Sequence, residues 1–248
     1  MAKRSTLRQP LAPNQAQQLH QQQILNIVRR GKYLLAHTSH DSLDLLIHLG
    51  MSGSLRLCEK NTPFKKHDHT SFTFINGQCL RYHDPRRFGF ITTVARNQAI
   101  TAFSHMGVEP LEQSFNAHYL YARAQKSKSA IKNLIMNQKI VVGVGNIYAN
   151  EALFFSRIHP NTPAQQLTLT QCAQLVQTIK DVLTQAIAVG GTTLKDFVHS
   201  DGSTGYFQQT LNVYGKEGKP CPNCNTQSIM STIIGGRNSY FCPNCQPL

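Results

Sequence analysis

Hydrophobic and polar positions change their spacing about half-way along the chain. Between Ile24 and Val94 the apolar residues form short runs or alternate with polar ones, and Gly, Asn, Pro and charged residues separate the runs. This spacing is typical of β-strands, and the Asn-Gly pair in INGQ, residues 75–78, predicts a hairpin turn. The predicted strands are ILNIV, KYLLAH, LDLLIHLG, GSLRLC, SFTFI and QCLRYH. Several short strands at this interval favour a β-sandwich.

From Asn116 onward the apolar positions recur at helical spacing. Three short helices are predicted in NAHYLYARAQ, SAIKNLIMNQ and NIYANEALFFSR, followed by a longer one in TLTQCAQLVQTIKDVLTQAIAVGG. Thr168 and Gln171 form a capping box at the start of the long helix, and Gly190 and Gly191 end it. The pattern therefore predicts an α+β protein with a domain boundary near residues 105–125.

Charge narrows the class of partner. The 248 residues contain 25 Lys and Arg against 12 Asp and Glu, a formal net charge of +13. Such an excess favours polyanions, either nucleic acid or an anionic membrane surface. The chain has no apolar run long enough to span a bilayer, and its basic N-terminus lacks the apolar core of a secretory signal. We therefore expect a protein of the reducing cytoplasm, where paired cysteines more often bind metal than form disulfides.

Two cysteine pairs near the C-terminus predict a metal site. Cys221-Pro-Asn-Cys224 and Cys242-Pro-Asn-Cys245 can each aim two thiolates at one point. Four soft ligands suit tetrahedral Zn²⁺, and a site closed by four protein ligands is structural rather than catalytic. The alternative is two disulfides or four free thiols. The other three cysteines are isolated and are predicted to be core residues: Cys58, Cys79 and Cys172.

Two further stretches have features of phosphate binding. Residues 113–150 contain no Asp or Glu but hold five basic residues: Arg123, Lys126, Lys128, Lys132 and Lys139. In VVGVGN, Gly143 and Gly145 expose backbone amides and Asn146 stands where a helix would begin, which makes a potential anion site. Arg237 follows two glycines at a predicted hairpin tip, and the alternative is an ordinary solvated arginine.

The strand region also contains a basic and aromatic turn. DPRRFG predicts a turn that lifts Arg86, Arg87 and Phe88 off a strand end, a combination that suits backbone contact and insertion between bases. A metal-dependent hydrolase site is the less favoured alternative, because no metal-ligand spacing supports it. The residues of the right types for that alternative are His67, Asp68, His69, His83 and Asp84.

Taken in order, the motifs resemble a known family, the formamidopyrimidine-DNA glycosylases of bacterial base-excision repair. The matching stretches are RRGKYLL, HLGMSGSL, KHDH, DPRRFG, HMGVEPL, KIVVGVGNIYA, GGTTLKDF, SDGSTGYF and the two cysteine pairs. They cover nearly the whole chain from about Leu7, and several fit this branch better than the related endonuclease VIII branch. The resemblance implies a monomeric enzyme, beside the chromosome in the bacterial cytoplasm, that acts on double-stranded DNA. It would flip out and remove oxidised purines such as 8-oxoguanine and formamidopyrimidines, and nick the abasic site by elimination.

The resemblance also implies a division into domains and roles for single residues. A β-sandwich at residues 1–108, truncated at its start, would precede a helix-two-turn-helix domain at 114–206 and a zinc-finger hairpin at 207–248. The wedge that fills the gap left by a flipped base would be Met51, Arg86 and Phe88, and residues 192–206 would cover that base. The implied DNA-binding residues are His67, Arg86, Lys128, Asn146 and Arg237. Lys32 and Arg237 would act at the reacting sugar, and one structural Zn²⁺ would be held by Cys221, Cys224, Cys242 and Cys245.

One family feature has no counterpart in this chain. The resemblance places the chemistry in an N-terminal Pro-Glu-Leu-Pro-Glu, whose proline amine attacks C1′ of the sugar while the glutamate moves protons. No PELPE occurs here, so neither role can be carried to a residue. Three explanations are open: a reading frame that starts upstream, a true truncated relative, and a degraded gene product. We expect the first, because the downstream motifs are intact. The rival functions are a catalytically silent damaged-DNA-binding protein and a general nucleic-acid module.

Overall fold

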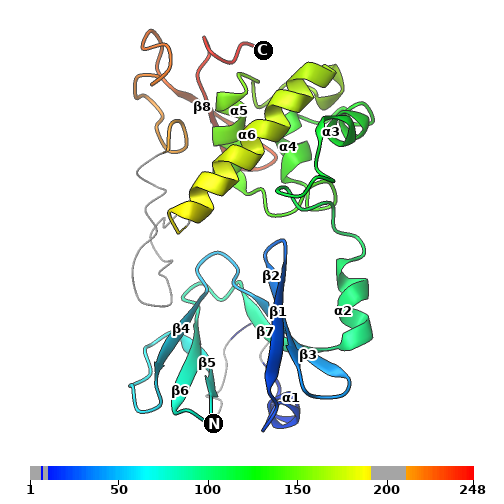
Figure 1. Cartoon of the computed structure of the whole chain (residues 1–248). Helices are drawn as coiled ribbons and strands as arrows, with labels where there is room; N and C mark the ends of the chain where they lie inside the picture. The colour runs from blue at the N-terminus through cyan, green and yellow to red at the C-terminus, as the bar shows by residue number, and fades with distance from the viewer. Residues whose placement is uncertain (1–6, 8–10, 191–210) are drawn as a thin grey trace. The chain divides into compact units, whose positions relative to one another are not determined.

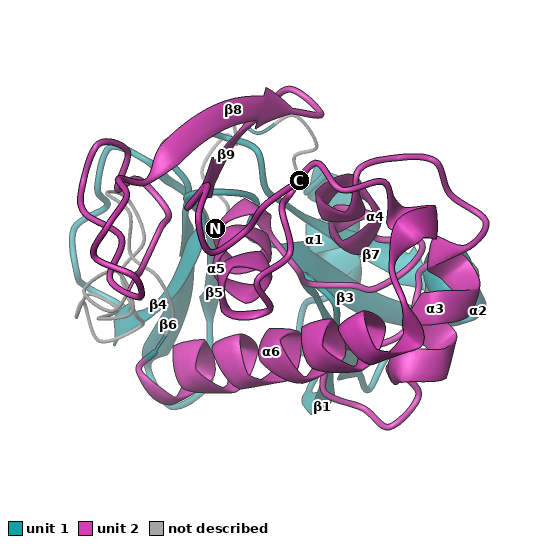
Figure 2. Ribbon diagram, turned by 90° about the horizontal axis from the view of Figure 1, so that it is seen from above, with its two compact units in different colours: residues 1–105, 190–208 teal, residues 106–189, 209–248 magenta. Residues whose placement is uncertain are grey.

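The computed structural model describes residues 7, 11–190 and 211–248 (Figure 1). The chain divides into two compact units (Figure 2). The first contains residues 1–105 and 190–208, and the second contains residues 106–189 and 209–248. No helix in the described part of the chain is long and apolar enough to cross a bilayer.

The first unit is a β-sandwich of two antiparallel sheets, as predicted. One sheet has the strand order β1-β2-β3-β7, and the other has the order β4-β6-β5. The strands are β1 (Ile24–Arg30), β2 (Tyr33–Thr38), β3 (Leu43–His48), β4 (Ser54–Glu59), β5 (Asp68–Thr73), β6 (Gln78–His83) and β7 (Phe90–Ala95). Two helices precede and follow them: α1 (Pro13–Gln18) and α2 (Arg96–Phe103).

The core of this unit lies between the two sheets. Ala36 of β2 and Leu45 and Ile47 of β3 meet Tyr82 of β6 and Ile91 of β7, and none of the five is more than 5% exposed. Leu45 and Ile47 are two residues apart on β3, which is the spacing that places side chains on the same face of a strand.

Six strands were predicted from the sequence and are confirmed, together with the INGQ turn. Gly77 has φ +83°, and the Phe74 amide donates to the Gln78 carbonyl at 2.9 Å to close the hairpin. The sequence pattern predicts neither α1 nor α2, nor β7 as a separate strand. No residue of α1 is buried, so this helix has no apolar stripe by which a pattern could reveal it.

The second unit is helical and ends in a hairpin. Its helices are α3 (Ala117–Ala124), α4 (Ile131–Met136), α5 (Asn146–Phe155), the 3₁₀ turn η1 (Ala164–Gln166) and α6 (Leu169–Ala188). The hairpin strands are β8 (Met230–Ile234) and β9 (Arg237–Phe241). All four predicted helices are confirmed.

The long helix α6 has the cap and the buried face that its sequence predicts. Thr168 donates its amide to Gln171 Oε1 at 2.9 Å and accepts the Gln171 amide on Oγ1 at 3.2 Å, which is the capping box. Its apolar stripe, including Leu175, Ile179 and Leu183, lies in a core shared with α3, α4 and α5. This core fixes α5, on which much of the candidate site depends.

Candidate functional site

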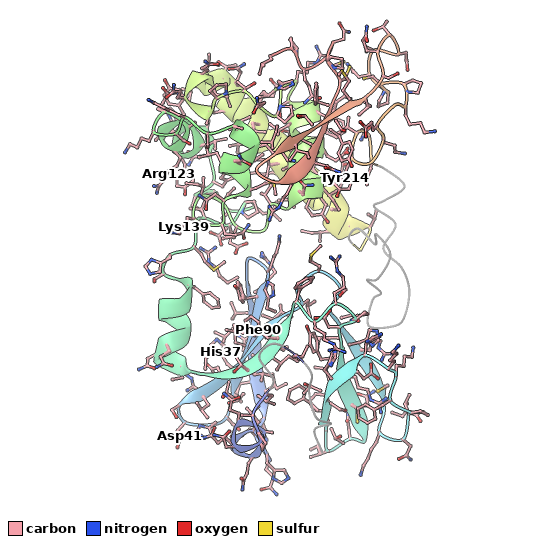
Figure 3. The ribbon with its side chains drawn as sticks, turned by 180° about the vertical axis from the view of Figure 1, so that it is seen from behind. His37, Asp41, Phe90, Arg123, Lys139 and Tyr214 are labelled. Carbon is pink, nitrogen blue, oxygen red and sulfur yellow. The ribbon has the colours of Figure 1, made fainter. Side chains whose placement is uncertain are left out.

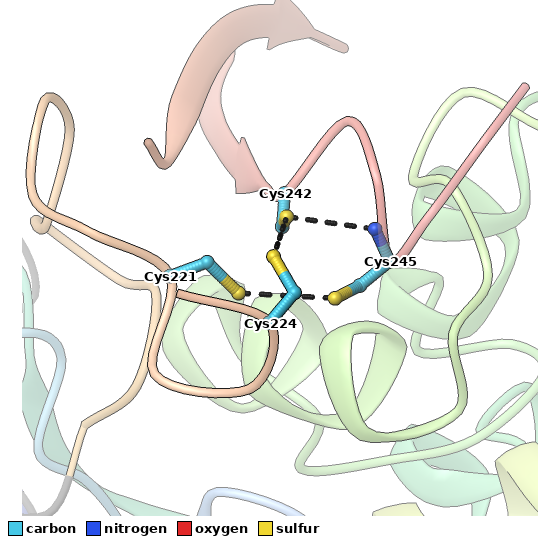
Figure 4. Close-up of side chains that lie close together, drawn as sticks. All are labelled: Cys221, Cys224, Cys242 and Cys245. Carbon is cyan, nitrogen blue, oxygen red and sulfur yellow. Dashed lines mark hydrogen bonds between the residues drawn. The ribbon is translucent and has the colours of Figure 1, made fainter. Parts of the chain in front are cut away.

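Four cysteines form a compact cluster at the base of the hairpin (Figure 4). Their sulfur atoms all lie within 4.8 Å of one another, and Cys221 Sγ is 3.8 Å from Cys245 Sγ. Cys224 Sγ lies 3.7 Å from Cys242 Sγ. These separations exceed the roughly 2.05 Å of a disulfide, so the thiols are free to bind a metal. Hydrogen bonds from Thr226 lower the pKa of the Cys224 thiol to about 5, which supplies one ready thiolate at neutral pH.

The cluster is anchored to the helical core through Gln246. The Cys242 amide donates to Gln246 Oε1 at 3.0 Å, and Gln246 Nε2 donates to the Ile158 carbonyl at 2.8 Å. The buried apolar residues around the cluster come from three parts of the unit: Phe154, Val213 and Ile229. A metal here would therefore tie the hairpin to the end of α5.

The hairpin tip packs tightly on α4. A Cβ atom on Gly235 would lie 2.3 Å from Asn133 Oδ1, and Gly235 has φ +58°, so only glycine fits. Lys132 of α4 is fully buried and donates from Nζ to the Asn238 carbonyl at 2.9 Å and to Ser239 Oγ at 2.5 Å. Arg237, exposed at the start of β9, is thus carried on a rigid support.

Asn146 is the first residue of α5, as predicted, and lies beside the hairpin tip. Its Nδ2 donates to the Asn238 carbonyl at 3.1 Å, while its buried Oδ1 has no hydrogen-bond partner. Gly145 is the N-cap and provides no side-chain cap, and a helix N-terminus of this kind suits an anion. The structure therefore brings Asn146 and Arg237 together through Asn238.

Lys128 is exposed on the loop between α3 and α4. Residues 113–150, which contain no Asp or Glu, hold further basic side chains. Among them are Arg123, whose guanidinium carbon is 5.2 Å from the Tyr119 ring centre, and Lys139 (Figure 3). Lys132 differs from them, because it is buried and serves the packing of the hairpin.

In the first unit, two loops carry the predicted wedge. Met51, on the β3–β4 loop, is 67% exposed, and Phe88, on the β6–β7 loop, is 44% exposed. The Arg86 guanidinium carbon lies 5.3 Å from the Phe88 ring centre. Exposed apolar side chains that gather beside a basic residue on two loops suit a partner surface.

Lys32 lies at the end of the four-stranded sheet where β3 ends and β7 begins, which is the end that carries the two wedge loops. It is exposed in the turn that joins β1 to β2, and the next residue, Tyr33, pairs with His48, the last residue of β3. His48 in turn pairs with Phe90, the first residue of β7. Burial, followed by the charge of Lys32, lowers the pKa of His48. Register therefore places Lys32 near the loop that carries Met51.

His67 is half-buried at the end of a loop held by a charged network. Asp68, fully buried, accepts from Arg56 Nη2 at 2.6 Å and from His83 Nδ1 at 2.8 Å. Burial alone raises the pKa of Asp68, but hydrogen bonds from the Lys65 amide and from His83, with the charge of Arg56, hold it below its usual value. Asp68 is thus an ionised structural anchor.

The same network argues against the metal-hydrolase alternative. His69 Nε2 donates to the Asp84 carbonyl at 2.8 Å, and both Asp68 oxygens are already hydrogen-bonded. Among residues 7, 11–190 and 211–248, the four hairpin cysteines are the only group of three or more His, Cys, Asp or Glu side chains placed to hold a metal ion. The predicted loop at 192–206 lies outside the described residues.

Sequence reasoning missed Glu151 of α5. Its buried carboxylate accepts four hydrogen bonds, from the Asn212 amide at 2.8 Å, from Asn212 Nδ2 at 3.1 Å, and from the Val213 and Tyr214 amides at 3.0 and 2.9 Å. Its donors are more than sixty positions away along the chain, so no local motif signals them. Tyr214 in turn packs its ring 5.2 Å from the ring of Tyr240 on β9.

Comparisons with known proteins match both units. The family model "Formamidopyrimidine-DNA glycosylase N-terminal domain" matches residues 1–91, and "Formamidopyrimidine-DNA glycosylase H2TH domain" matches residues 106–198. The chain is 52% identical to the formamidopyrimidine-DNA glycosylase of Hydrogenovibrio crunogenus, over 97% of this chain and 85% of that protein. It is 49% identical to that of Dichelobacter nodosus, over 97% of this chain and 88% of that protein.

Solved structures give the same match in three dimensions. A complex of Lactococcus lactis Fpg with DNA containing an abasic site superposes with a TM-score of 0.90 at 33% identity, covering 100% of this chain and 91% of that one. A mutant of the same protein bound to DNA containing Fapy-dG gives a TM-score of 0.91 at 33% identity, with the same coverage.

Proposed function

The chain belongs to the formamidopyrimidine-DNA glycosylase family, and from that premise we propose that it is a base-excision repair enzyme with glycosylase and AP-lyase activity. Its substrates are oxidised purines, 8-oxoguanine and formamidopyrimidines, in double-stranded DNA. The observation that carries the proposal is the match over both units to relatives of that name, with about half of all residues identical. Solved relatives hold abasic and Fapy-dG DNA, the lesions expected after and before base removal. We place its work in the bacterial cytoplasm, with the chromosome.

Met51, Arg86 and Phe88 are proposed as the wedge. A base that leaves the stack creates a gap whose neighbours have lost stacking, and an apolar or planar group in the gap lowers that cost. The exposed thioether of Met51 and ring of Phe88 supply such groups, and the nearby guanidinium of Arg86 can stack or contact a phosphate.

Asn146, Arg237 and Lys128 are proposed to hold phosphates, with His67 as a further contact. The support is the helix N-terminus at Asn146, its buried and unpartnered Oδ1, and the rigid hairpin tip that presents Arg237 beside it. A guanidinium and the backbone amides of a helix N-terminus can both bind phosphate oxygens. Lys128, exposed on its loop, adds charge without a defined geometry.

Zn²⁺ is proposed as the ion of the four-cysteine cluster. Four sulfur ligands within 4.8 Å fit tetrahedral zinc, and no ligand position is left open for catalysis. The ion would hold the hairpin against α5, so that its contribution is to place Arg237. Its chemistry is structural, because the hairpin has few buried residues of its own to keep it folded.

Lys32 and Arg237 are proposed as the residues of this chain that act near the reacting sugar. The family resemblance gives the nucleophile and proton-transfer roles to an N-terminal proline and glutamate, and no residue of these 248 matches them. We therefore assign to Lys32 and Arg237 positioning and charge stabilisation of the sugar-phosphate, and no bond-forming step.

Borohydride trapping on duplex DNA containing 8-oxoguanine tests the proposal. A protein extended upstream in frame to a Pro-Glu start is expected to form a covalent adduct and to nick the strand, and a failure to do both overturns the enzymatic function. The 248-residue chain is expected to bind abasic-site duplex more tightly than intact duplex, with an affinity that falls as salt rises. Equal affinity for the two duplexes would point to a general nucleic-acid module instead.

A further inference from the structure

The two loops that carry the proposed wedge are separate in sequence but share one buried carboxylate. Residues 49–53 join β3 to β4, and residues 84–89 join β6 to β7. Asp84, 0% exposed, accepts the Ser52 hydroxyl on Oδ1 at 2.6 Å, which links the second loop to the first. Met51 is the residue just before Ser52, so the link lies directly behind the wedge.

The other oxygen of Asp84 fixes its own loop and the strand below. Oδ2 accepts the Gly89 amide at 2.9 Å and the Tyr82 hydroxyl at 3.2 Å. The Arg87 amide also donates to this carboxylate. One carboxylate therefore receives four hydrogen bonds, three of them from its own loop and β6 and one from the neighbouring loop.

Ser52 extends the link to Arg86. Its Oγ donates its single hydrogen to Asp84 and accepts the Arg86 amide at 3.1 Å. The hydroxyl is fully buried, so no water competes for these bonds. The residue after Met51 thus positions the backbone of Arg86 directly.

Glycines allow the two loops to touch through their backbones. A Cβ atom on Gly50 would lie 2.6 Å from the Gly89 amide nitrogen and 2.7 Å from the Phe88 carbonyl carbon. A Cβ atom on Gly89 would lie 2.0 Å from Tyr82 Oη and 2.4 Å from the His48 carbonyl oxygen. The backbones of the two loops therefore pack directly against each other, at a distance that only glycine permits.

Asp84 is ionised, as an acceptor of four hydrogen bonds must be. Burial alone raises the pKa of Asp84, but hydrogen bonds from Ser52, Gly89 and Tyr82 outweigh it and hold the pKa below its usual value. Burial and the charge of Asp84 raise the pKa of Tyr82, so the phenol remains a donor. The network is therefore complete at neutral pH.

We propose that Asp84 and Ser52 are positioning residues that lock the two wedge loops into one body, so that Met51, Arg86 and Phe88 enter the DNA together. The proposal rests on the proposed function. Two independently moving loops would each lose conformational freedom on insertion, and that loss would weaken binding to DNA with a vacated base. Locked loops have lost that freedom already, on folding. Binding to intact duplex, which uses phosphate contacts, does not depend on the lock.

Ser52→Ala is the decisive variant, because Asp84→Asn disturbs four hydrogen bonds and can impair folding. Ser52→Ala removes the link between the loops and leaves the Gly89 and Tyr82 bonds to Asp84 in place. Ser54→Ala is the matched control. Ser54 is a neighbouring buried serine, 1% exposed, whose Oγ has no hydrogen-bond partner.

The 248-residue chain and each variant are titrated with two duplexes, one intact and one containing a tetrahydrofuran abasic analogue with 2-aminopurine beside it. Ser52→Ala removes the hydrogen bond to the charged Asp84 and the one from the Arg86 amide. It is expected to reduce the preference for the abasic duplex by at least about tenfold, the scale of a hydrogen bond to a charged group. It is also expected to reduce the 2-aminopurine signal of insertion, with intact-duplex affinity unchanged within about twofold. Ser54→Ala is expected to behave as the unaltered chain.

The results of these titrations distinguish a failure of the loop lock from a failure of the proposed function. If Ser52→Ala keeps the full abasic preference while its thermal stability falls, the serine is only structural and the lock is wrong. If it weakens both duplexes equally, the lock is also wrong. If the unaltered chain itself shows no abasic preference, the proposed function fails, whatever the variants do.

Discussion

The ammonium group of Lys132 lies 2.5 Å from the hydroxyl of Ser239, which joins a fully buried lysine of α4 to the middle of β9. Burial, and then the charge of Arg237, lower the pKa of Lys132 to about 8. The buried ammonium group of Lys132 thus supports the strand from which the exposed Arg237 side chain projects.

We expect this lysine to make stability depend on pH. Between pH 8 and 10.5 the unfolded chain keeps the proton on Lys132 while the folded chain loses it, so the unfolded state binds more protons and stability rises with pH. The total gain is at most about 3.5 kcal/mol, from about 1.4 kcal/mol per pKa unit. Urea unfolding across this window measures it, with Lys132→Met as the comparison. Parallel curves for the two proteins would show that Lys132 does not contribute.

Glu151→Gln is expected to destabilise the second unit. The glutamine amide replaces one carboxylate oxygen by a donor that faces donors, so about half of the four hydrogen bonds are lost, at a cost of about 2–4 kcal/mol. Urea unfolding gives the value. Glu112→Gln, at an exposed glutamate, is the control and is expected to change stability by less than about 0.5 kcal/mol. Equal effects of the two substitutions would contradict the anchoring role of Glu151.

Metal removal is expected to release the hairpin. The purified chain should contain one zinc per molecule by atomic spectroscopy, and Cys242→Ser should lose the metal because it removes one of four ligands. The affinity for DNA should fall with it, since Arg237 loses its support. Cys58→Ser, outside the cluster, should keep both metal and affinity. A metal-free protein with undiminished binding would rule out the structural role of the ion.

Arg237 and Met51 are expected to differ in their response to salt. Arg237→Ala removes a phosphate contact. The plot of log affinity against log salt should therefore become less steep, with the magnitude of its negative slope reduced by about one. Met51→Ala removes no charge and should leave the slope unchanged while it weakens binding to abasic-site duplex. Fluorescence titrations from low to moderate salt distinguish them. An unchanged slope for Arg237→Ala would remove that residue from the phosphate site.

The local spacing of apolar and polar residues was sufficient to predict much of the fold. The runs of β2 and β3, the Thr168 cap of α6 and the two cysteine pairs are short-range features, and the structure confirms the elements and the four-cysteine cluster. Burial of one face makes such periods visible. The bounds of the three predicted domains and the roles of the site residues remain predictions.

The sequence pattern could not reveal the buried charged residues, because their roles depend on contacts with residues distant in the sequence. Asp84 and Glu151 are single acidic residues whose partners, Ser52 and residues 212–214, lie far away along the chain. The charge pattern predicts Lys132 as one of several basic residues available to phosphate, yet it is buried and bonded to the hairpin. A charge count places a lysine on the surface by default, and only tertiary packing reveals the exception.

The anchors on α5 have a consequence for how the chain can vary. Asn146 and Asn150 reach the hairpin and Glu151 reaches residues 212–214, all from one ten-residue helix. Each residue added to a helix rotates everything beyond it by about 100°. A single insertion after Asn146 would turn the other two anchors away from their partners at once. Helix α5 should therefore tolerate substitution on its surface but not a change of length, whereas the Asn-Gly turn after the fully exposed Ile75 should accept inserted residues or a label.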